Sequence, residues 1–183
     1  LQLALAEVSP PPTIELQVGA MLMETAVQLI AEKIEALLSE HPKTNCVLLI
    51  LSAVNQLDTT ALGMLTELEK TLAARNIRLQ FAEIKGPVQD RLRQTELGER
   101  MQNKIFLSTH QAFLDYLKKN PSPIPYTLVS CGEQGAIAQF NGHLYDVTAP
   151  SIQLVNPTGS GDSTVAGAIY AFKNHLSDEN IIR

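Results

Sequence analysis

Apolar and polar residues follow one another along this chain with the periods of strands and helices. A near-continuous apolar run at residues 47–51 is typical of a central strand that is covered on both faces. A polar turn follows, and leucines at helical spacing then predict an amphipathic helix over residues 59–72: Leu62, Leu65, Leu68 and Leu72. In this helix Glu67, Glu69 and Lys70 are expected to face solvent. A buried strand therefore leads to a hydroxyl-rich helix start at the surface.

The segments before and after this pair continue the alternation. Strands are predicted over residues 13–18, 77–84 and 105–107, and helices over residues 25–38, 88–95 and 111–119. The apolar stripe of the first helix is Leu29, Ile30, Ile34, Leu37 and Leu38. Because proline lacks a backbone N–H, Pro10, Pro11 and Pro12 break any helix there, so residues 1–12 are expected to be an extension and linker. The order of elements predicts an α/β fold, a mixed β-sheet with packed helices.

A change of composition marks the second half of the chain. Residues 120–125 contain three prolines and predict a linker. The segment that follows has strands at residues 126–130, 136–140 and 143–148, an extended stretch at residues 152–155, a glycine loop, and a helix at residues 163–175. Asn141 and Gly142 form a strong hairpin signal between two of these strands. The predicted divisions are residues 1–12, 13–119, 120–125 and 126–183, the last a β-hairpin, glycine loop and helix.

Composition and charge exclude several classes of protein. The 183 residues hold 14 Lys and Arg against 19 Asp and Glu, which argues against a nucleic-acid partner. No apolar run approaches the roughly 20 residues that cross a bilayer, so the chain is expected to be soluble by itself. Cys46 and Cys131 lack the spacing of a metal site and are expected to be buried free thiols in a reducing, cytoplasmic location. The four histidines are dispersed, so no metal site is expected: His41, His110, His143 and His175.

The polar turn after the central strand carries a specific resemblance. Residues 55–62, Asn-Gln-Leu-Asp-Thr-Thr-Ala-Leu, resemble the STAS domain, the fold shared by anti-sigma-factor antagonists and the cytoplasmic tails of SulP-family anion transporters. Residues 79–92 resemble the third strand and following helix of the SulP version, and the resemblance covers about residues 13–119. It implies a non-catalytic regulatory domain on the cytoplasmic side of an inner or plasma membrane transporter. The implied partners are the transmembrane domain of the same transporter, a second copy in a homodimer, and a regulatory protein; the anion would be sulfate, bicarbonate or another.

Asp58, Thr59 and Thr60 in this turn have two interpretations. All three are good helix N-caps, because a side-chain oxygen there accepts a backbone N–H of the first turn. The resemblance adds a regulatory role, since anti-sigma antagonists are phosphorylated at the hydroxyl residue that Thr59 matches. Ala61 stands where those antagonists usually have glycine, and they more often carry serine than threonine. A free-standing switch phosphorylated at Thr59 therefore stays as an alternative to the transporter domain.

A second resemblance lies near the end of the chain. Residues 156–168, Asn-Pro-Thr-Gly-Ser-Gly-Asp-Ser-Thr-Val-Ala-Gly-Ala, form a phosphate-cradle pattern, because Gly159 and Gly161 let backbone N–H groups point at an anion before a helix. With residues 129–136 and 149–150, this string closely resembles the PfkB (ribokinase-like) sugar kinases, of the tagatose-6-phosphate type. The resemblance implies that Asp162 is the general base, and that the backbone around Gly159, Ser160 and Gly161 stabilises the transferring phosphoryl group.

The kinase resemblance covers only about residues 125–183. A family member needs a long N-terminal α/β portion with the sugar site, and here a STAS-like segment stands in that place. Positioning supplies most of the catalysis of phosphoryl transfer, so half a site is expected to have no catalytic residue at work, Asp162 included, and no cofactor. The chain is interpreted as a composite, with an artificial join favoured over a natural fusion. The alternative is a phosphosugar kinase with an unusual N-terminal domain.

Overall fold

A computed structural model of the chain describes residues 13–17, 21–22, 24–121, 126–149 and 160–181. The chain divides into two compact units, residues 1–112 and 113–183, and the division falls within helix α5 (Thr109–Lys119). Each unit is described by itself. The domain limits expected at residues 13, 119 and 126 stay predictions. Residues 122–125 of the predicted linker, the extended stretch at residues 152–155 and Gly159 lie outside the described residues.

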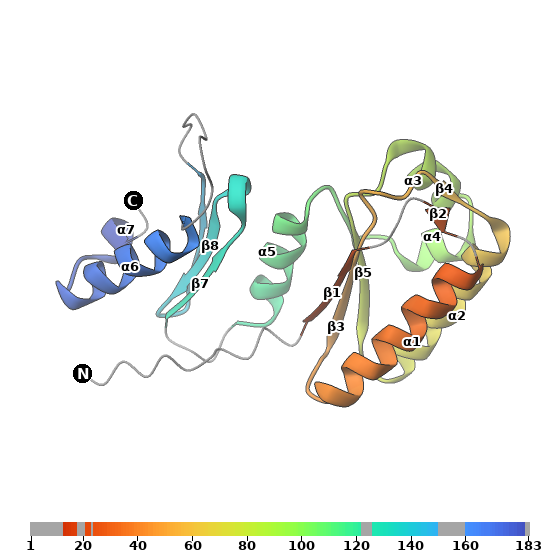
Figure 1. Ribbon diagram of the computed structural model, residues 1–183, viewed down its shortest axis with the longest axis horizontal. Coiled ribbons are helices and arrows are strands. Elements are labelled where there is room, and N and C mark those ends of the chain that lie inside the picture. Colours follow the sequence, from red (N-terminus) through yellow and green to blue (C-terminus); the bar gives the residue numbers. More distant parts are fainter. Residues whose placement is uncertain (1–12, 18–20, 23, 122–125, 150–159, 182–183) are drawn as a thin grey trace. The chain divides into compact units, whose positions relative to one another are not determined.

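The first unit is built on a four-stranded parallel sheet (Figure 1). Its strands lie in the order β1 (Thr13–Gln17), β3 (Cys46–Ile50), β5 (Arg78–Ala82) and β6 (Ile105–Phe106). The register of β3 against β5 places Leu49 beside Phe81. Two shorter strands, β2 (Met21–Leu22) and β4 (Gln56–Leu57), form a separate parallel pair. Parallel strands need crossover connections, and helices supply them here.

Four helices of the first unit complete its core. They are α1 (Glu24–Glu40), α2 (Thr59–Ala74), α3 (Gly86–Arg93) and α4 (Glu96–Arg100). Helices α1 and α2 lie side by side along one face of the sheet (Figure 1). The core joins both helices to the two central strands through buried apolar side chains that include Ile34, Leu38, Val47, Leu49, Leu65, Leu72, Leu79 and Phe81. Cys46 and Leu48, which alternate with these residues on β3, are also buried, so the strand is covered on both faces as predicted.

The second unit contains an antiparallel three-stranded sheet with β8 (Ala136–Phe140) in the middle. Its neighbours are β7 (Tyr126–Ser130) and β9 (His143–Val147), and a 3₁₀ turn η1 (Gly132–Gln134) precedes β8. Helices α6 (Ser160–Lys173) and α7 (Asp178–Ile181) follow. Phe172 of α6 packs its ring 4.7 Å from that of Tyr126 and 5.8 Å from that of Phe140. Every residue of β8 is buried, and the predicted hairpin turn at Asn141 and Gly142 is confirmed, both residues having positive φ.

The α/β fold class is confirmed, and several local predictions need correction. A single mixed sheet was expected, but the strand pairs of the first unit are parallel and those of the second unit are antiparallel. Leu29 was expected in the apolar stripe of α1 but is exposed, and Val27 is buried instead. Helix α4 was not predicted, because five residues are too few to display a helical period. Cys131 is a free thiol that is only partly buried.

Candidate functional site

The start of α2 is fixed by Asp58, whose backbone is extended just before the helix. One carboxylate oxygen of Asp58, Oδ1, accepts a hydrogen bond of 2.6 Å from the backbone N–H of Ala61. This bond satisfies a donor that has no partner inside the helix, and it holds the first turn in place. Thr59 and Thr60 are the first two helical residues, and both are exposed. Of the three candidates, Asp58 therefore caps the helix and the two threonines present their side chains to solvent.

Two cationic side chains lie beside this turn. Lys85, at the N-cap of α3, donates from Nζ to Oδ1 of Asn55 across 2.5 Å. Arg91, one and a half turns further along, places Nη2 at 3.5 Å from Oγ1 of Thr59. The ends of β3 and β5 bring these segments together, because consecutive parallel strands deliver their connections to the same edge of a sheet. We call this set the α2–α3 face: Asn55, Asp58, Thr59, Thr60, Lys85 and Arg91.

The two cations of the α2–α3 face, Lys85 and Arg91, form no ion pair within the described part of the chain. Nearby acidic groups have other partners: Asp90 faces Arg93 at 3.7 Å, and Glu83 accepts from the Thr109 hydroxyl at 2.8 Å. The N-termini of α2 and α3 add partial positive charge at the same edge. A negatively charged group is therefore the ligand that this face favours.

A buried ionic cluster lies further along α2, at Glu69. Glu69 is only 3% exposed, and its two oxygens accept from Arg100 at 2.6 Å and from Lys104 at 2.9 Å. Burial alone would raise the pKa of Glu69, but the hydrogen bonds and charges of Lys104 and Arg100 outweigh it and hold that pKa below its usual range. Glu69 was expected to face solvent, which is wrong. The cluster ties α2 to α4 and to the segment that leads into β6.

The sequence identified part of this arrangement. The capping turn was found from its Asp-Thr-Thr string, whereas Lys85, Arg91 and Glu69 were not singled out. The N-cap position of Lys85, directly before Gly86 and Pro87, was a visible signal that it lies at a helix start. Nothing local identifies Arg91 or Glu69, because their contacts are with residues 31 to 35 positions away in the chain.

The kinase-like loop is described only in part. Ser160, Gly161 and Asp162 form the first turn of α6, but their side chains lie outside the described residues, as does the whole of Gly159. The anion-loop and general-base roles of these residues stay predictions.

Upstream, Gly135 has φ of +94°, and a Cβ atom there would lie 1.9 Å from the carbonyl oxygen of Val147. The turn before β8 therefore requires glycine at this position.

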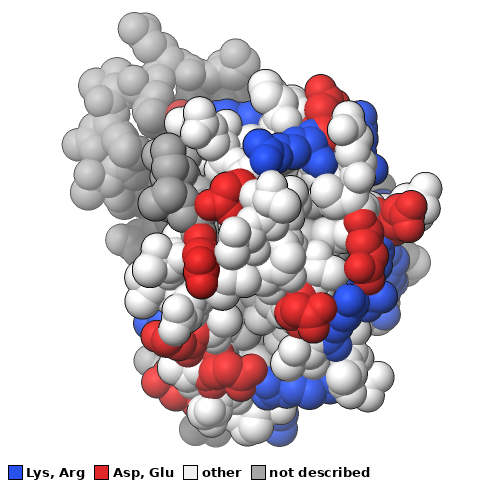
Figure 2. Space-filling view, turned by 90° about the vertical axis from the view of Figure 1, so that its right-hand side faces the viewer, with Lys and Arg blue, Asp and Glu red and all other residues white. Residues whose placement is uncertain are grey.

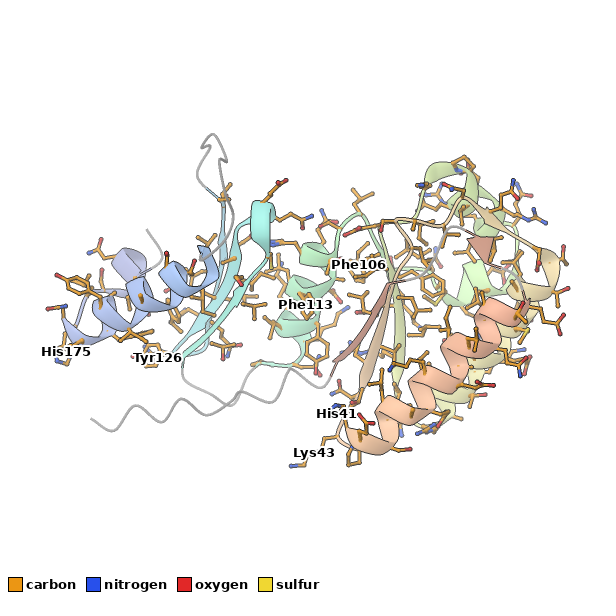
Figure 3. The ribbon with its side chains drawn as sticks, viewed as in Figure 1. His41, Lys43, Phe106, Phe113, Tyr126 and His175 are labelled. Carbon is orange, nitrogen blue, oxygen red and sulfur yellow. The ribbon has the colours of Figure 1, made fainter. Side chains whose placement is uncertain are left out.

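Within the described ranges, no three His, Cys, Asp or Glu side chains are placed to share a metal ion. His41 lies in the first unit and His175 in the second, as Figure 3 shows. Among the helices that the structure describes, none combines the length and the apolarity that crossing a bilayer requires.

Two family models match the chain. The STAS domain model matches residues 6–112, and the pfkB family carbohydrate kinase model matches residues 91–183. The two matches overlap at residues 91–112, which contain the end of α3, all of α4, β6 and the start of α5. The first match contains the whole α2–α3 face, and the second contains the glycine loop and Asp162.

Solved structures with a similar fold include three proteins of anion transport. They are murine Solute Carrier 26 family member A9, an anion transporter (TM-score 0.53, 18% identity), the STAS domain of a SulP transporter from Vibrio cholerae (0.51, 16%) and a sulfate transporter family protein from Wolinella succinogenes (0.50, 17%). The matches cover 60%, 60% and 62% of this chain, and 18%, 84% and 90% of those chains, respectively. This chain thus spans less than a fifth of the murine transporter. At these identities the likeness shows the fold.

Proposed function

Because the chain belongs to the STAS domain family over residues 6–112 and to the pfkB family of carbohydrate kinases over residues 91–183, we propose that its two parts have unequal roles. The STAS part is the regulatory domain of a SulP-type inorganic anion transporter and acts through protein contacts. The anion is sulfate or bicarbonate. The partners are the transmembrane domain of the same transporter, a second copy in a homodimer, and a regulatory protein, on the cytoplasmic side of an inner or plasma membrane.

The observation that carries this proposal is the α2–α3 face. Its hydroxyls are exposed, its helix is held by a capping carboxylate, and its two cations bond to neutral oxygens. Such a face presents charge and hydrogen-bonding groups on a rigid support, which suits recognition of another protein. The fold shared with domains from sulfate and other anion transporters supports the choice of a transporter as the parent protein.

The transporter proposal is tested in cells that carry the native gene. An in-frame deletion of the codons for residues 13–119 should lower uptake of radiolabelled sulfate or bicarbonate, and antibody against this chain should find it in the membrane fraction. A deletion of the codons for residues 126–181 is the matched control and should leave uptake close to normal. Unchanged uptake of both anions after the first deletion, with the antigen in the soluble fraction, would reject the transporter.

Phosphoryl transfer is a second candidate, favoured by the pfkB match over residues 91–183. In this proposal Asp162 is the base, and the backbone of residues 159–161 holds the transferring phosphoryl group. We favour the inactive form of the segment, because the matched residues supply only the glycine loop and the base and leave the sugar to be positioned by other parts. Transfer of phosphate from ATP to a hexose phosphate, lost in Asp162→Asn and kept in Asp146→Asn, would establish the kinase instead.

A third candidate is a switch at Thr59. The exposed hydroxyl lies 3.5 Å from the guanidinium of Arg91, so a phosphate on that oxygen would have a cation within reach. Mass spectrometry of the chain isolated from its native cells tests it. Phosphate on Thr59 and none on the equally exposed Thr60 would support the switch, and an unmodified Thr59 under all growth conditions would remove it.

A further inference from the structure

The chemistry of the α2–α3 face points to one class of partner. We propose that Lys85 and Arg91 bind a carboxylate-rich segment of a protein, with Thr59 and Thr60 donating hydrogen bonds between them. The inference deepens the proposed function, since it rests on the view that the domain acts through protein contacts. It assigns to that function a surface and the charge of what the surface recognises.

The hydrogen-bond partners of the two cations carry the argument. Lys85 donates to an amide oxygen at 2.5 Å, and the acceptor of Arg91 within the described residues is a hydroxyl oxygen at 3.5 Å. Several other cations of the first unit lie against carboxylates, such as Arg75 against Glu35 at 2.6 Å and Lys70 against Glu67 at 3.1 Å. Replacing a neutral acceptor by a carboxylate gives a shorter, charge-assisted hydrogen bond, and Arg can take a carboxylate in two parallel bonds. A partner's Asp or Glu would therefore be bound more strongly than the present acceptors are.

The extent of the positive charge favours a peptide segment over a larger polyanion. Asp90 is next to Arg91 in the sequence, and Asp58 is next to Thr59, which contacts Arg91, so a membrane or a nucleic acid would meet negative charge close to these binding groups. Figure 2 shows Lys and Arg alternating with Asp and Glu over the face of the molecule that it presents. A flexible peptide can place a few carboxylates on Lys85 and Arg91 while it avoids the neighbouring aspartates. Such a peptide therefore matches two cations that are flanked by hydroxyl donors.

Binding of fluorescein-labelled hexaglutamate peptide to the full chain, followed by fluorescence anisotropy, tests the proposal. The double variant Lys85→Gln/Arg91→Gln should bind about tenfold more weakly or worse, because two charge-assisted contacts are lost. Lys33→Gln/Lys43→Gln is the matched control, since both lysines are exposed and the net charge changes equally. Figure 3 shows Lys43 at the end of α1 that is remote from α3. The control should bind within about twofold of the unchanged chain.

Further arms separate the proposal from its competitors. Thr59→Glu should weaken peptide binding, because its carboxylate would compete for Arg91, whereas Thr59→Gln should not. Raising NaCl from roughly 50 to 300 mM should also weaken binding, as expected for exposed charges. Binding to phosphatidylcholine vesicles with about one third phosphatidylserine, without binding to the peptide, would replace the protein segment by a lipid surface. If both double variants lost the same peptide affinity, the net charge of the chain and not a specific site would explain the binding. That result would overturn the proposal.

These outcomes are separable from those of the transporter test. Loss of anion uptake after deletion of residues 13–119, combined with no specific peptide binding, would keep the proposed function and discard this face as its partner site. Specific peptide binding with unchanged uptake and a soluble antigen would keep the face and discard the transporter.

Discussion

The two units of this chain bury their apolar residues in different ways. The first unit places a parallel sheet against two long helices, and its buried residues come from strands and helices spread over residues 27–101. In the second unit, most of the buried residues described are those of the single strand β8, and the others are Tyr116 and Leu117 of α5 and Ala171 of α6. Only Ala171 of α6 is buried among the residues of that helix whose burial is described. A core built from many elements resists the loss of one side chain better than a core centred on one strand.

This difference bears on function. The proposed function requires the contact face to keep one arrangement, and the α2–α3 face includes the capped start of α2, a helix that also holds Glu69 bonded to Arg100 and Lys104. The kinase-like unit depends on a small core and on a sharp glycine turn. The following predictions test this contrast, beginning with the largest expected effect.

Truncation of one large buried ring in each unit should give the clearest test of whether the two cores differ in robustness. Phe81 and Phe140 are each 1% exposed, and truncation of such a ring to Ala costs about 3–5 kcal/mol. We expect Phe140→Ala to abolish amide protection throughout β7–β9, while Phe81→Ala weakens β3 and β5 but leaves measurable protection. Hydrogen exchange read by mass spectrometry resolves the two units, and the chain has no Trp for a fluorescence assay.

Exposed side chains control for the change of size in this experiment. Leu107→Ala and Tyr170→Ala remove side chains that are 81% and 67% exposed, and exchange should change little in either unit. If Phe140→Ala left β7–β9 as well protected as Phe81→Ala leaves β3, the second core would be as robust as the first, and the comparison would fail.

Substitution of Gly135 should affect the second unit alone. The φ of +94° is strained for Ala, and the added Cβ would collide with the carbonyl oxygen of Val147, so Gly135→Ala should cost roughly 3 kcal/mol or more. Gly142 is the matched control, since its φ is +85° but no atom lies within 4 Å of the added Cβ. Gly142→Ala should cost only about 1–2 kcal/mol of backbone strain. Urea unfolding monitored by hydrogen exchange of β8 measures both, and equal costs would remove the collision as the cause.

Glu69→Gln should loosen the support of α2 in a pH-dependent way. Hydrogen bonds to charged groups contribute about 1.5–3 kcal/mol, and the solvent exposure of Arg100 and Lys104 reduces the expected loss to about 1–2 kcal/mol at neutral pH. Because the pKa of Glu69 is lowered by folding, its stabilisation is complete above the ordinary glutamate pKa. It is lost as pH falls through the lower folded value.

Chemical denaturation of the unchanged chain and of Glu69→Gln over a series of acidic pH values checks this sign. The difference in unfolding free energy should be largest at neutral pH and should vanish in strong acid. Glu67→Gln is the control, because Glu67 is 74% exposed, and its effect should be much smaller. A difference between the two proteins that grows on acidification would contradict the assigned pKa direction.

The smallest predicted effect concerns the cap of α2. Asp58→Ala removes the acceptor for the Ala61 N–H and should cost about 1 kcal/mol, whereas Asp58→Asn keeps an acceptor and should cost a few tenths at most. Thermal unfolding of the first unit measures both. Full stability with impaired regulation in Asp58→Asn would give Asp58 a role beyond capping, and equal destabilisation by both variants would show that the carboxylate charge itself matters.

Much of the first unit could be predicted because its signals are local. The apolar run at residues 47–51 and the leucine period after Asp58 specify a buried strand and an amphipathic helix, and both are found. The strand at residues 77–84 ends earlier than predicted, at Ala82, because Glu83 takes a φ of +61° and turns the chain. Strands β2 and β4 have two residues each and were not predicted, because so short a segment cannot display an alternating period.

The sequence by itself determined the order of the longer elements, the two families and the position of the Asp-Thr-Thr turn, because each of these depends on residues that are neighbours in the chain. Only the tertiary structure decided which charges meet. Glu69 belongs to a polar stretch of α2 yet is buried by Arg100 and Lys104, and Arg91 comes from a helix some 30 residues beyond Thr59. Helical and strand periods place a side chain on a face, but the partner on that face is chosen by how separate elements pack.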